Sequence, residues 1–299
     1  MRVFSLLFSF SIILLPFAGS QITFQNHQNT ILRVDTGSYG PAIEETIDET
    51  FFGSENATGF ISVQALYVTP KTAKRPETLW VLDTGRPNDA SQMAYALPGG
   101  TKLVAIDLDS DTIIRTYLFP STVNYPSSSV NDVRFDLREN ITTSGSGVAY
   151  ISDESPEGRN GIIVLDLGTG ETWRHLDRHP AGLSGYGVVP SYQGIPFYQE
   201  TVSRPFTHLP QGLDGIQLDL TGSVLFFSSM TSDYLFSVET KYLLDHTSPS
   251  CIQAANNAVK NLGQRGGNGN GFEGDSNGLI YQAMPEQNAV YAYDPSTLR

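Results

Sequence analysis

The stretch GLDGIQLDLTGSVLFFSS, residues 212–229, contains the pattern that decides the fold. Apolar and other residues alternate from Ile216 to Leu220, which predicts a β-strand with one buried face. Thr221-Gly222 then predicts a turn, and residues 224–229 predict a second strand. Asp214-Gly215 is a dipeptide that often turns a hairpin. Here it precedes the first strand, so the position of Asp214 needs another explanation.

The same order of strands recurs along the chain. An aromatic or apolar strand is followed by a polar loop and by a second strand that ends at a tight turn. The paired segments are 78–85 with 103–107, 148–153 with 161–166, 224–229 with 234–238, and 279–283 with 289–294. A further strand is expected in front of three of these pairs, at 61–68, 133–137 and 216–220. Repeated units of three or four antiparallel strands are typical of the blades of a β-propeller. A β-sandwich is the alternative all-β fold, but its strands need not repeat one hairpin pattern.

The N-terminus predicts a secreted protein. Arg2 precedes an apolar run from Val3 to Phe17, and Ala18-Gly19-Ser20 supplies the small residues that signal peptidase requires. We therefore expect residues 1–20 to be a signal peptide, because the run is too short for a spanning helix. Asn56 and Asn140 begin N-glycosylation sequons, which agree with an extracellular location.

The charge balance excludes some classes of partner. The chain has 31 acidic residues against 18 basic ones, and its formal net charge is −13. Nucleic acids and anionic membranes bind basic patches, so neither is expected as a partner. Cys251 is the single cysteine and cannot form an internal disulfide. Stability must therefore come from burial of apolar surface in a chain of this length.

Several segments together resemble one protein family. They are LWVLDTG (79–85), VNDVRFD (130–136), YISD (150–153), GIIVLDLGTGETWR (161–174) and LGQRG (262–266). This combination resembles the major royal jelly protein/yellow family, and its fungal secreted members in particular, from about Gly59 to the C-terminus. The resemblance implies an extracellular six-bladed β-propeller. It also implies a central channel in which some members bind small amines or other ligands. Insect members are linked to melanin formation, and a dopachrome-converting activity is attributed to some of them. Others are nutritive or structural, so the resemblance predicts the fold more directly than the activity.

Three regions are expected from these patterns. Residues 1–20 form the signal peptide, residues 21–58 an N-terminal segment with an incomplete first blade, and residues 59–299 the β-propeller domain. Residues 21–58 lack the hairpin pattern where a first blade should lie, and a last blade should follow Arg299. We therefore expect about four to five blades of the all-β, six-bladed architecture in this chain, which is shortened at both ends relative to the family.

Polar residues at the starts of two predicted inner strands are the main candidate site. Asn131 and Asp132 precede Val133, and Asp214 precedes Ile216, at equivalent positions of two blades. Inner strands line the central channel of a propeller, so these side chains are predicted to converge on a ligand. Each could instead cap its own loop.

A divalent cation is a further possibility at these positions. Oxygen ligands suit Ca²⁺, and Asn131 and Asp214 are the candidate ligands. The positions resemble those that supply metal ligands in gluconolactonase-type propellers. This chain departs from that pattern, since Val133 and Asp214 stand where Gly and Asn are expected.

Two other segments invite a role in binding. Phe197 and Tyr198 could line an apolar pocket for a flat ligand, or could pack within the blades. The glycine-rich run 263–278 lacks the lysine and the strand–loop–helix setting of a phosphate loop, so we expect it to be a long loop between blades.

Three functions are compatible with the sequence. The first is a secreted propeller that binds a small molecule in its channel. The second is an isomerase, tautomerase or lactonase-like enzyme, in which Asp132 or Asp214 acts as acid or base and a divalent cation stabilises charge. The third is a non-catalytic extracellular structural protein. The sequence alone does not decide between them, and it makes no prediction of the oligomeric state.

Overall fold

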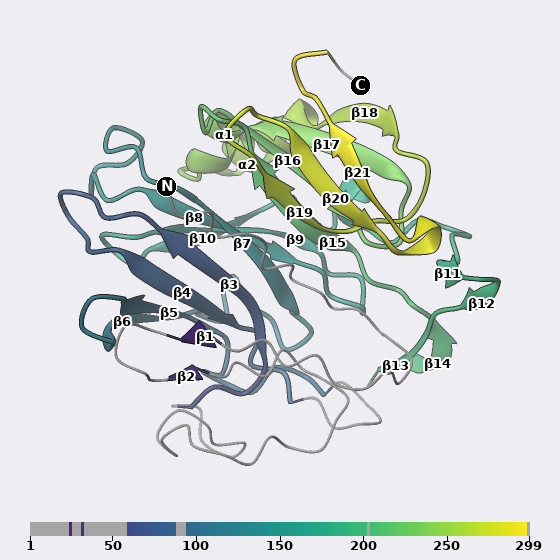
Figure 1. Cartoon of the computed structure of the whole chain (residues 1–299), viewed down its shortest axis with the longest axis horizontal. Coiled ribbons are helices and arrows are strands. Elements are labelled where there is room, and N and C mark those ends of the chain that lie inside the picture. Colours follow the sequence, from purple (N-terminus) through teal and green to yellow (C-terminus); the bar gives the residue numbers. More distant parts are fainter. Residues whose placement is uncertain (1–23, 26–30, 33–58, 88–93, 202–203, 298–299) are drawn as a thin grey trace.

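A computed structural model describes residues 24–25, 31–32, 59–87, 94–201 and 204–297. Four antiparallel sheets form the body of the molecule as the blades of a propeller (Figure 1).

The first blade contains β3 (Val63–Thr69), β4 (Thr78–Asp83), β5 (Lys102–Asp107) and β6 (Thr112–Leu118). The second contains β7 (Val130–Asp136), β8 (Val148–Asp153), β9 (Gly161–Asp166) and β10 (Thr172–His175). The third contains β15 (Leu213–Leu218), β16 (Val224–Ser229), β17 (Tyr234–Glu239) and β18 (Lys260–Gln264). The fourth contains β19 (Asn270–Gly274), β20 (Ile280–Met284) and β21 (Ala289–Tyr293).

The first strand of each blade lies on the inside. Strand β7 contacts both β3 and β15, and β15 also contacts β19, so neighbouring blades meet through these four strands. In each blade the chain then runs outward, strand by strand. This confirms an all-β propeller. The described residues form four blades, and the six-blade count of the complete fold stays a prediction.

The hydrophobic core lies between the blades. All six residues of β8 and all six of β9 are buried, because both faces of the second blade are covered. Alternate residues point to opposite faces of a sheet. Ala149 and Ile151 of β8 accordingly pack against the first blade, whereas Val148 and Tyr150 pack against the third. This two-sided burial explains why these strands read as continuous apolar runs in the sequence.

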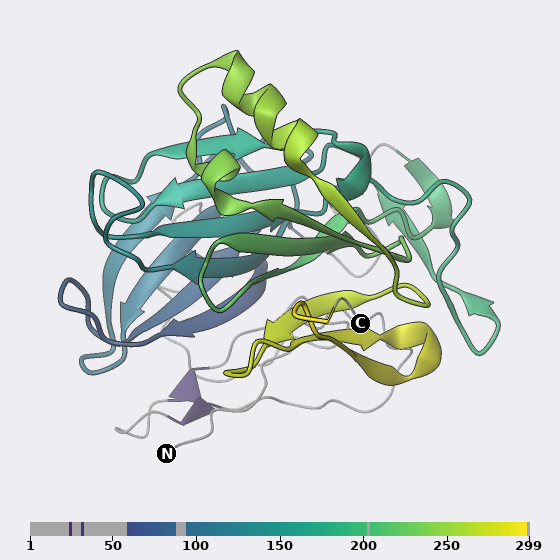
Figure 2. The same ribbon diagram turned by 90° about the horizontal axis from the view of Figure 1, so that it is seen from above.

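Two helices cover the outer edge of the second and third blades. Helix α1 (Thr240–Leu244) contacts α2 (Pro249–Ala258), and α2 also contacts β10 and β17 (Figure 2). Leu243 and Ala255 bring apolar side chains to this contact. Across the described residues, no helix is long and apolar enough to cross a membrane.

Short elements lie at the periphery. Two hairpins between the second and third blades project to one side (Figure 1). They pair β11 (Ser191–Tyr192) with β12 (Ile195–Pro196), and β13 (Tyr198–Thr201) with β14 (Arg204–His208). Strands β1 (Phe24–Gln25) and β2 (Ile31–Leu32) form another pair. Single 3₁₀ turns occur at η1 (Pro180–Gly182) and η2 (Pro285–Gln287).

The four predicted hairpins are confirmed, and two boundaries change their meaning. Strands β7 and β15 begin at Val130 and Leu213, three residues earlier than predicted. Asn131, Asp132 and Asp214 therefore lie within the inner strands and not in front of them. The expectation of one long loop over residues 263–278 is wrong, because β19 lies inside it. Its asparagine and glycine residues leave Phe272 as a lone large apolar side chain, so no alternation marks this strand.

Candidate functional site

A β-bulge near the start of each inner strand sets the geometry of the site. In β7, Val130 pairs with Asp153 and Val133 with Ile151, so β7 carries one residue more than β8 between these pairs. In β15, Leu213 pairs with Ser229 and Ile216 with Phe227, which again leaves one extra residue. Bulges of the same kind occur in β3 and β19. A bulge redirects side chains locally and ends regular pairing, and bulges are frequent beside functional sites.

The residues of the two bulges correspond one to one in strand register. Val130-Asn131-Asp132-Val133 corresponds to Leu213-Asp214-Gly215-Ile216, so Asn131 and Asp214 are equivalent. Their relative exposure is only 1% each. Because β7 contacts β15 directly, the structure brings the two bulges to neighbouring inner strands, as predicted.

The side chains of Asn131 and Asp214 are buried and incompletely hydrogen-bonded: the Asn131 amide interacts with Glu154, and the backbone N–H of Gly271 interacts with the Asp214 carboxylate. Within the described residues, neither polar atom of the Asn131 amide and neither carboxylate oxygen of Asp214 forms a well-aligned hydrogen bond. Buried polar groups are nearly always paired, since leaving one unpaired costs the free energy of its lost hydration. These two side chains do not cap their own loops, which was the alternative explanation from the sequence.

Asp132 has a different role from its neighbour. Its Oδ1 lies 2.5 Å from Nη1 of Arg134 and accepts a hydrogen bond from the backbone of Val133, while Oδ2 accepts one from the backbone of Ile216 at 3.3 Å. Arg134 also donates to Oε1 of Gln217 at 2.7 Å and to the carbonyl of Phe272. This network ties three blades together and gives Asp132 a structural role, while its part in ligand binding or catalysis stays a prediction.

Glu154 adds a third acid to the site. It follows β8 and has a relative exposure of 2%, and its Oε2 has no hydrogen-bond partner within the described residues. Burial raises the pKa of Glu154 to about 7, and the side chain of Asn131 opposes that rise. Burial also raises the pKa of Asp214 well above its usual range, and the carboxylates of Glu154 and Asp132 raise it further. Such shifts are concentrated at functional sites.

Arg265 provides the opposite charge. It follows β18 and has a relative exposure of 4%, and its Nη2 donates to the carbonyls of Ser229, at 3.0 Å, and Ser232. Its Nε and Nη1 have no partner within the described residues. Burial lowers the pKa of Arg265 to about 10, and the Asp214 carboxylate opposes that change, so the guanidinium stays protonated at neutral pH. We call Asn131, Glu154, Asp214 and Arg265 the bulge site.

The sequence predicted half of this site. Asn131 and Asp214 were predicted, whereas Glu154 and Arg265 were missed. Glu154 follows the strand-ending Asp153, and Arg265 lies in the LGQRG segment, so both stood beside recognised motifs. Nothing in their spacing shows that a loop carries them to the inner strands.

The remaining candidates lie elsewhere. Phe197 is half-buried and Tyr198 is exposed, and they occupy the junction of β12 and β13 at the side of the molecule, outside the four blades (Figure 1). Asn140 is exposed on the turn after β7, where a glycan would be tolerated. Asn56 and the predicted signal peptide lie outside the described residues.

The oxygen atoms of the bulge site are of the type that binds a divalent cation. Asn131, Glu154 and Asp214 offer oxygen atoms without a well-aligned hydrogen bond among the described residues, which is the chemistry that Ca²⁺ requires. No group of three or more His, Cys, Asp or Glu residues in the described part of the chain is arranged to hold a metal ion. The oxygens thus suit a cation in kind, and a metal would depend on the Asn131 amide and on added ligands.

Comparison with known proteins identifies the fold family. The family model described as Major royal jelly protein matches residues 62–298. The chain belongs to the major royal jelly protein family. Curated relatives include Protein yellow of Drosophila erecta and of Drosophila melanogaster, each 28% identical over 176 residues. That alignment covers 56% of this chain and 29% of Protein yellow, so this member of the royal jelly family matches less than a third of those relatives' length.

Solved structures give weaker similarity. Hydrazine synthase of Kuenenia stuttgartiensis has a TM-score of 0.43 and 11% identity, and covers 73% of this chain and 56% of its own. The calcium-binding protein regucalcin of Agrobacterium tumefaciens has a TM-score of 0.41 and 13% identity, with coverages of 79% and 57%. The assignment to the royal jelly family therefore depends on the family model.

Proposed function

We propose that this protein binds a small polar molecule at the bulge site, in the centre of the propeller. One observation carries the proposal. Asn131 and Asp214 occupy equivalent bulges of neighbouring inner strands, and both side chains are buried without a well-aligned hydrogen bond among the described residues. A folded protein rarely keeps such groups unpaired, and a ligand that pairs them recovers the free energy of their lost hydration.

A binding screen tests this proposal. Thermal shift of the purified protein would be measured with a library of small polar compounds, each with and without Ca²⁺, because a ligand of the folded state raises the unfolding temperature. Asp214→Asn and Asn131→Ala should greatly reduce the shift. Asp219→Asn is the matched control, since it removes the same charge at the opposite end of β15, where Asp219 holds only its own turn. If no compound binds, the third function, a non-catalytic structural protein, replaces this proposal.

Acid–base catalysis is the second candidate. It is favoured by the raised pKa of Glu154, about 7, because a general acid or base works best with a pKa near the working pH. Asp214 would be the second acid of the pair. An isomerase, tautomerase or lactonase-like reaction would use both. Turnover of dopachrome or of a simple lactone, lost in Asp214→Asn and kept in Asp219→Asn, would establish an enzyme. Binding without turnover would leave a carrier or sensor.

A divalent cation would support either function. Asn131, Glu154 and Asp214 would hold it, and it would supply charge to stabilise an anionic group of the ligand. Calorimetry with Ca²⁺ tests this point. Heat of Ca²⁺ binding that disappears in Asp214→Asn supports a cation at this site. A titration that is the same in Asp214→Asn as in the wild type rules the cation out here.

Secretion is part of the same proposal. The apolar run near the N-terminus, the exposed Asn140 sequon and membership of a generally extracellular family all support it. Expression with the native N-terminus in a eukaryotic host should place the protein in the medium. Asn140→Gln should then lower its mass by one glycan.

A further inference from the structure

We infer that the ligand of the bulge site is dipolar: a cationic donor on it pairs with Asp214, and a carboxylate-like acceptor on it pairs with Arg265. This inference rests on the proposed function and names the chemical class of its ligand. It also assigns Arg265 as a binding residue.

Among the described residues, only one nitrogen of the Arg265 guanidinium is hydrogen-bonded. Nη2 donates to the carbonyls of Ser229 and Ser232, and the backbone N–H of Arg265 donates to the carbonyl of Asp233 at 2.8 Å. These bonds fix the side chain at the end of β16. Nε and Nη1 are buried without acceptors in the described part of the protein. These two N–H groups lie on different edges of the guanidinium, with Nη2 between them, so each can donate separately to an anionic acceptor such as a carboxylate oxygen.

Asp214 lies at the same end of the third blade. Leu213, its neighbour, pairs with Ser229, and the carbonyl of Ser229 is the one that Arg265 holds. The charge of Asp214 also opposes the lowering of the pKa of Arg265, in keeping with this placement. They do not pair, since both oxygens of Asp214 and both Nε and Nη1 of Arg265 lack a well-aligned hydrogen bond among the described residues. A group placed between them would have to donate to one and accept from the other.

The rest of the site requires the same combination. The amide of Asn131 can donate and accept, and neither of its polar atoms makes a well-aligned hydrogen bond within the described residues. A simple amine would leave Arg265 buried and unpaired, while a simple acid would lie against the carboxylates of Asp214 and Glu154. A site with unpaired groups of both kinds discriminates against ligands that satisfy only one kind.

The ionisation of the acids is consistent with a cationic partner. Burial and the neighbouring carboxylates raise the pKa of Asp214. A cationic group beside Asp214 would lower that pKa again, because an opposite charge favours the ionised form.

Matched sets of ligands test the inference. Each set shares one ring and differs only in its charged groups: phenylalanine, phenethylamine and 3-phenylpropionate, with the corresponding tyrosine and tryptophan sets. Calorimetry on the full chain should show at least about tenfold tighter binding of a dipolar member than of its amine or acid, since one lost charged contact costs that much or more. Arg265→Gln should remove the preference over the amine, and Asp214→Asn the preference over the acid. Arg265→Lys keeps the charge but loses the planar set of N–H donors. It should retain part of the preference.

The outcomes separate the inference from the proposed function. An amine that binds as tightly as its dipolar counterpart, with binding lost in Asp214→Asn, overturns the dipolar ligand and leaves the proposed function standing. The same holds if the library yields only non-dipolar ligands. Unchanged preferences in Arg265→Gln, with native circular dichroism, also overturn the assignment of Arg265. Failure of every set and of the whole library overturns both.

Discussion

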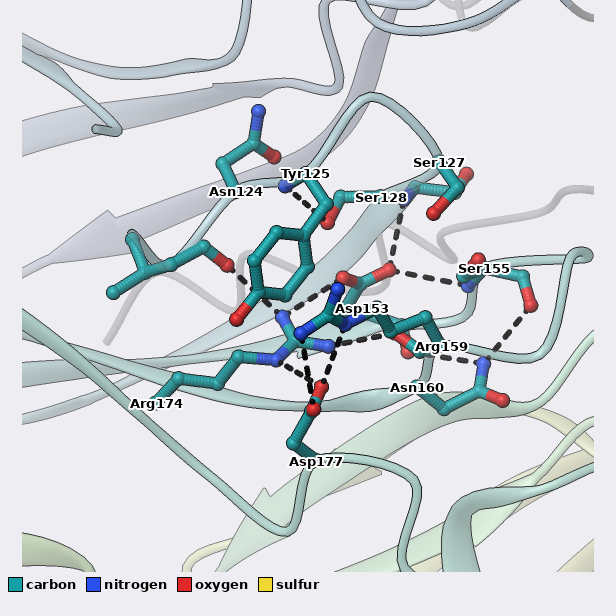
Figure 3. A network of polar contacts seen from close by, with 12 residues as sticks. Asn124, Tyr125, Ser127, Ser128, Asp153, Ser155, Arg159, Asn160, Arg174 and Asp177 are labelled. Carbon is teal, nitrogen blue, oxygen red and sulfur yellow. Dashed lines mark hydrogen bonds and ion pairs between the residues drawn. The ribbon is translucent and has the colours of Figure 1, made fainter. Parts of the chain in front are cut away.

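The Nη1 atom of Arg174 lies 2.9 Å from Oδ2 of Asp153, and both side chains are almost completely buried (Figure 3). Arg174 also donates to the carbonyls of Val123 and Arg159, and Oδ1 of Asp153 accepts from the backbone N–H of Ser129 and Ser155. The pair therefore holds the segment that leads into β7, and with it the bulge that carries Asn131. The first blade repeats this arrangement, because Asp83 pairs with Lys102 at 3.0 Å and accepts from the backbone before β3.

Loss of this buried pair should destabilise the protein strongly. Arg174→Met leaves a buried carboxylate without its counter-ion, and we expect the free energy of unfolding to fall by about 3–5 kcal/mol. Chemical denaturation monitored by circular dichroism measures the change. Lys241→Met is the control, because Lys241 and Glu239 form an exposed pair whose loss should have little effect on stability. Equal effects in the two variants would contradict the structural role of Asp153.

Asp132 and Asp214 should respond in opposite ways to the same substitution. Asp132→Asn removes the counter-ion of buried Arg134 and should cost about 3–5 kcal/mol. Asp214→Asn removes a buried charge that forms no ion pair among the described residues, so stability should stay equal or rise by about 1 kcal/mol while ligand binding is weakened. Denaturant midpoints of the two variants at pH 7 provide the comparison. A large loss of stability in Asp214→Asn would show that this side chain has a structural partner.

His175 should make the fold sensitive to mild acid. The pKa of His175 is lowered from its ordinary value of 6.5 to about 4. Burial is the main cause, and the nearby His246 contributes to the change. In mild acid, His175 therefore binds a proton in the unfolded chain but stays unprotonated in the folded protein. The stabilisation is complete above pH 6.5, is lost as the pH falls from 6.5 towards 4, and reaches at most about 3 kcal/mol. Carboxylates also titrate in this range, so the test is the difference from His175→Leu, which should lose less stability between pH 7 and pH 4.5. His208→Leu, on hairpin β13–β14, should behave as the wild type does.

Gly215 should not tolerate a side chain. A Cβ atom there would lie 2.9 Å from the carbonyl carbon of Gly271 and 3.0 Å from the backbone nitrogen of Phe272. Backbone atoms of β19 cannot move away without shifting the fourth blade, so Gly215→Ala should cost about 1–3 kcal/mol. Gly158→Ala is the comparison, since nothing lies within 4 Å of its Cβ position and only the strain of φ +84° remains. That strain alone should cost about 1 kcal/mol. A smaller effect at Gly215 would mean that β15 and β19 are less closely packed than described.

The sequence predicts the blades because each repeats the same order of apolar strands and polar turns. Strands β8 and β9 are buried on both faces, and their apolar runs mark them clearly. Strand β19 was missed since it carries asparagine and glycine where its neighbours carry valine or isoleucine. Asp83 and Asp153 end their strands and accept backbone hydrogen bonds from the segments that lead into β3 and β7.

The site is harder to predict because adjacent residues in it have different partners. Asn131 and Asp132 are neighbours, yet one forms no well-aligned hydrogen bond within the described residues and the other forms an ion pair with Arg134. That difference depends on which way each side chain leaves the bulge, and sequence spacing does not show it. Arg265 reaches the site from a loop, so its role follows only from the carbonyl groups that hold it.

The extra residue in each inner strand also separates two evolutionary pressures. Asn131 and Asp214 belong to none of the apolar clusters that join the blades, and the corresponding bulges of the first and fourth blades hold Gln64 and Gly271. Under the proposed function, mutations there would change the groups offered to a ligand while the apolar contacts between the blades stay intact. A scaffold with this property can diversify its ligands without first acquiring stabilising substitutions elsewhere. One family can thereby keep a single architecture and acquire unrelated specificities.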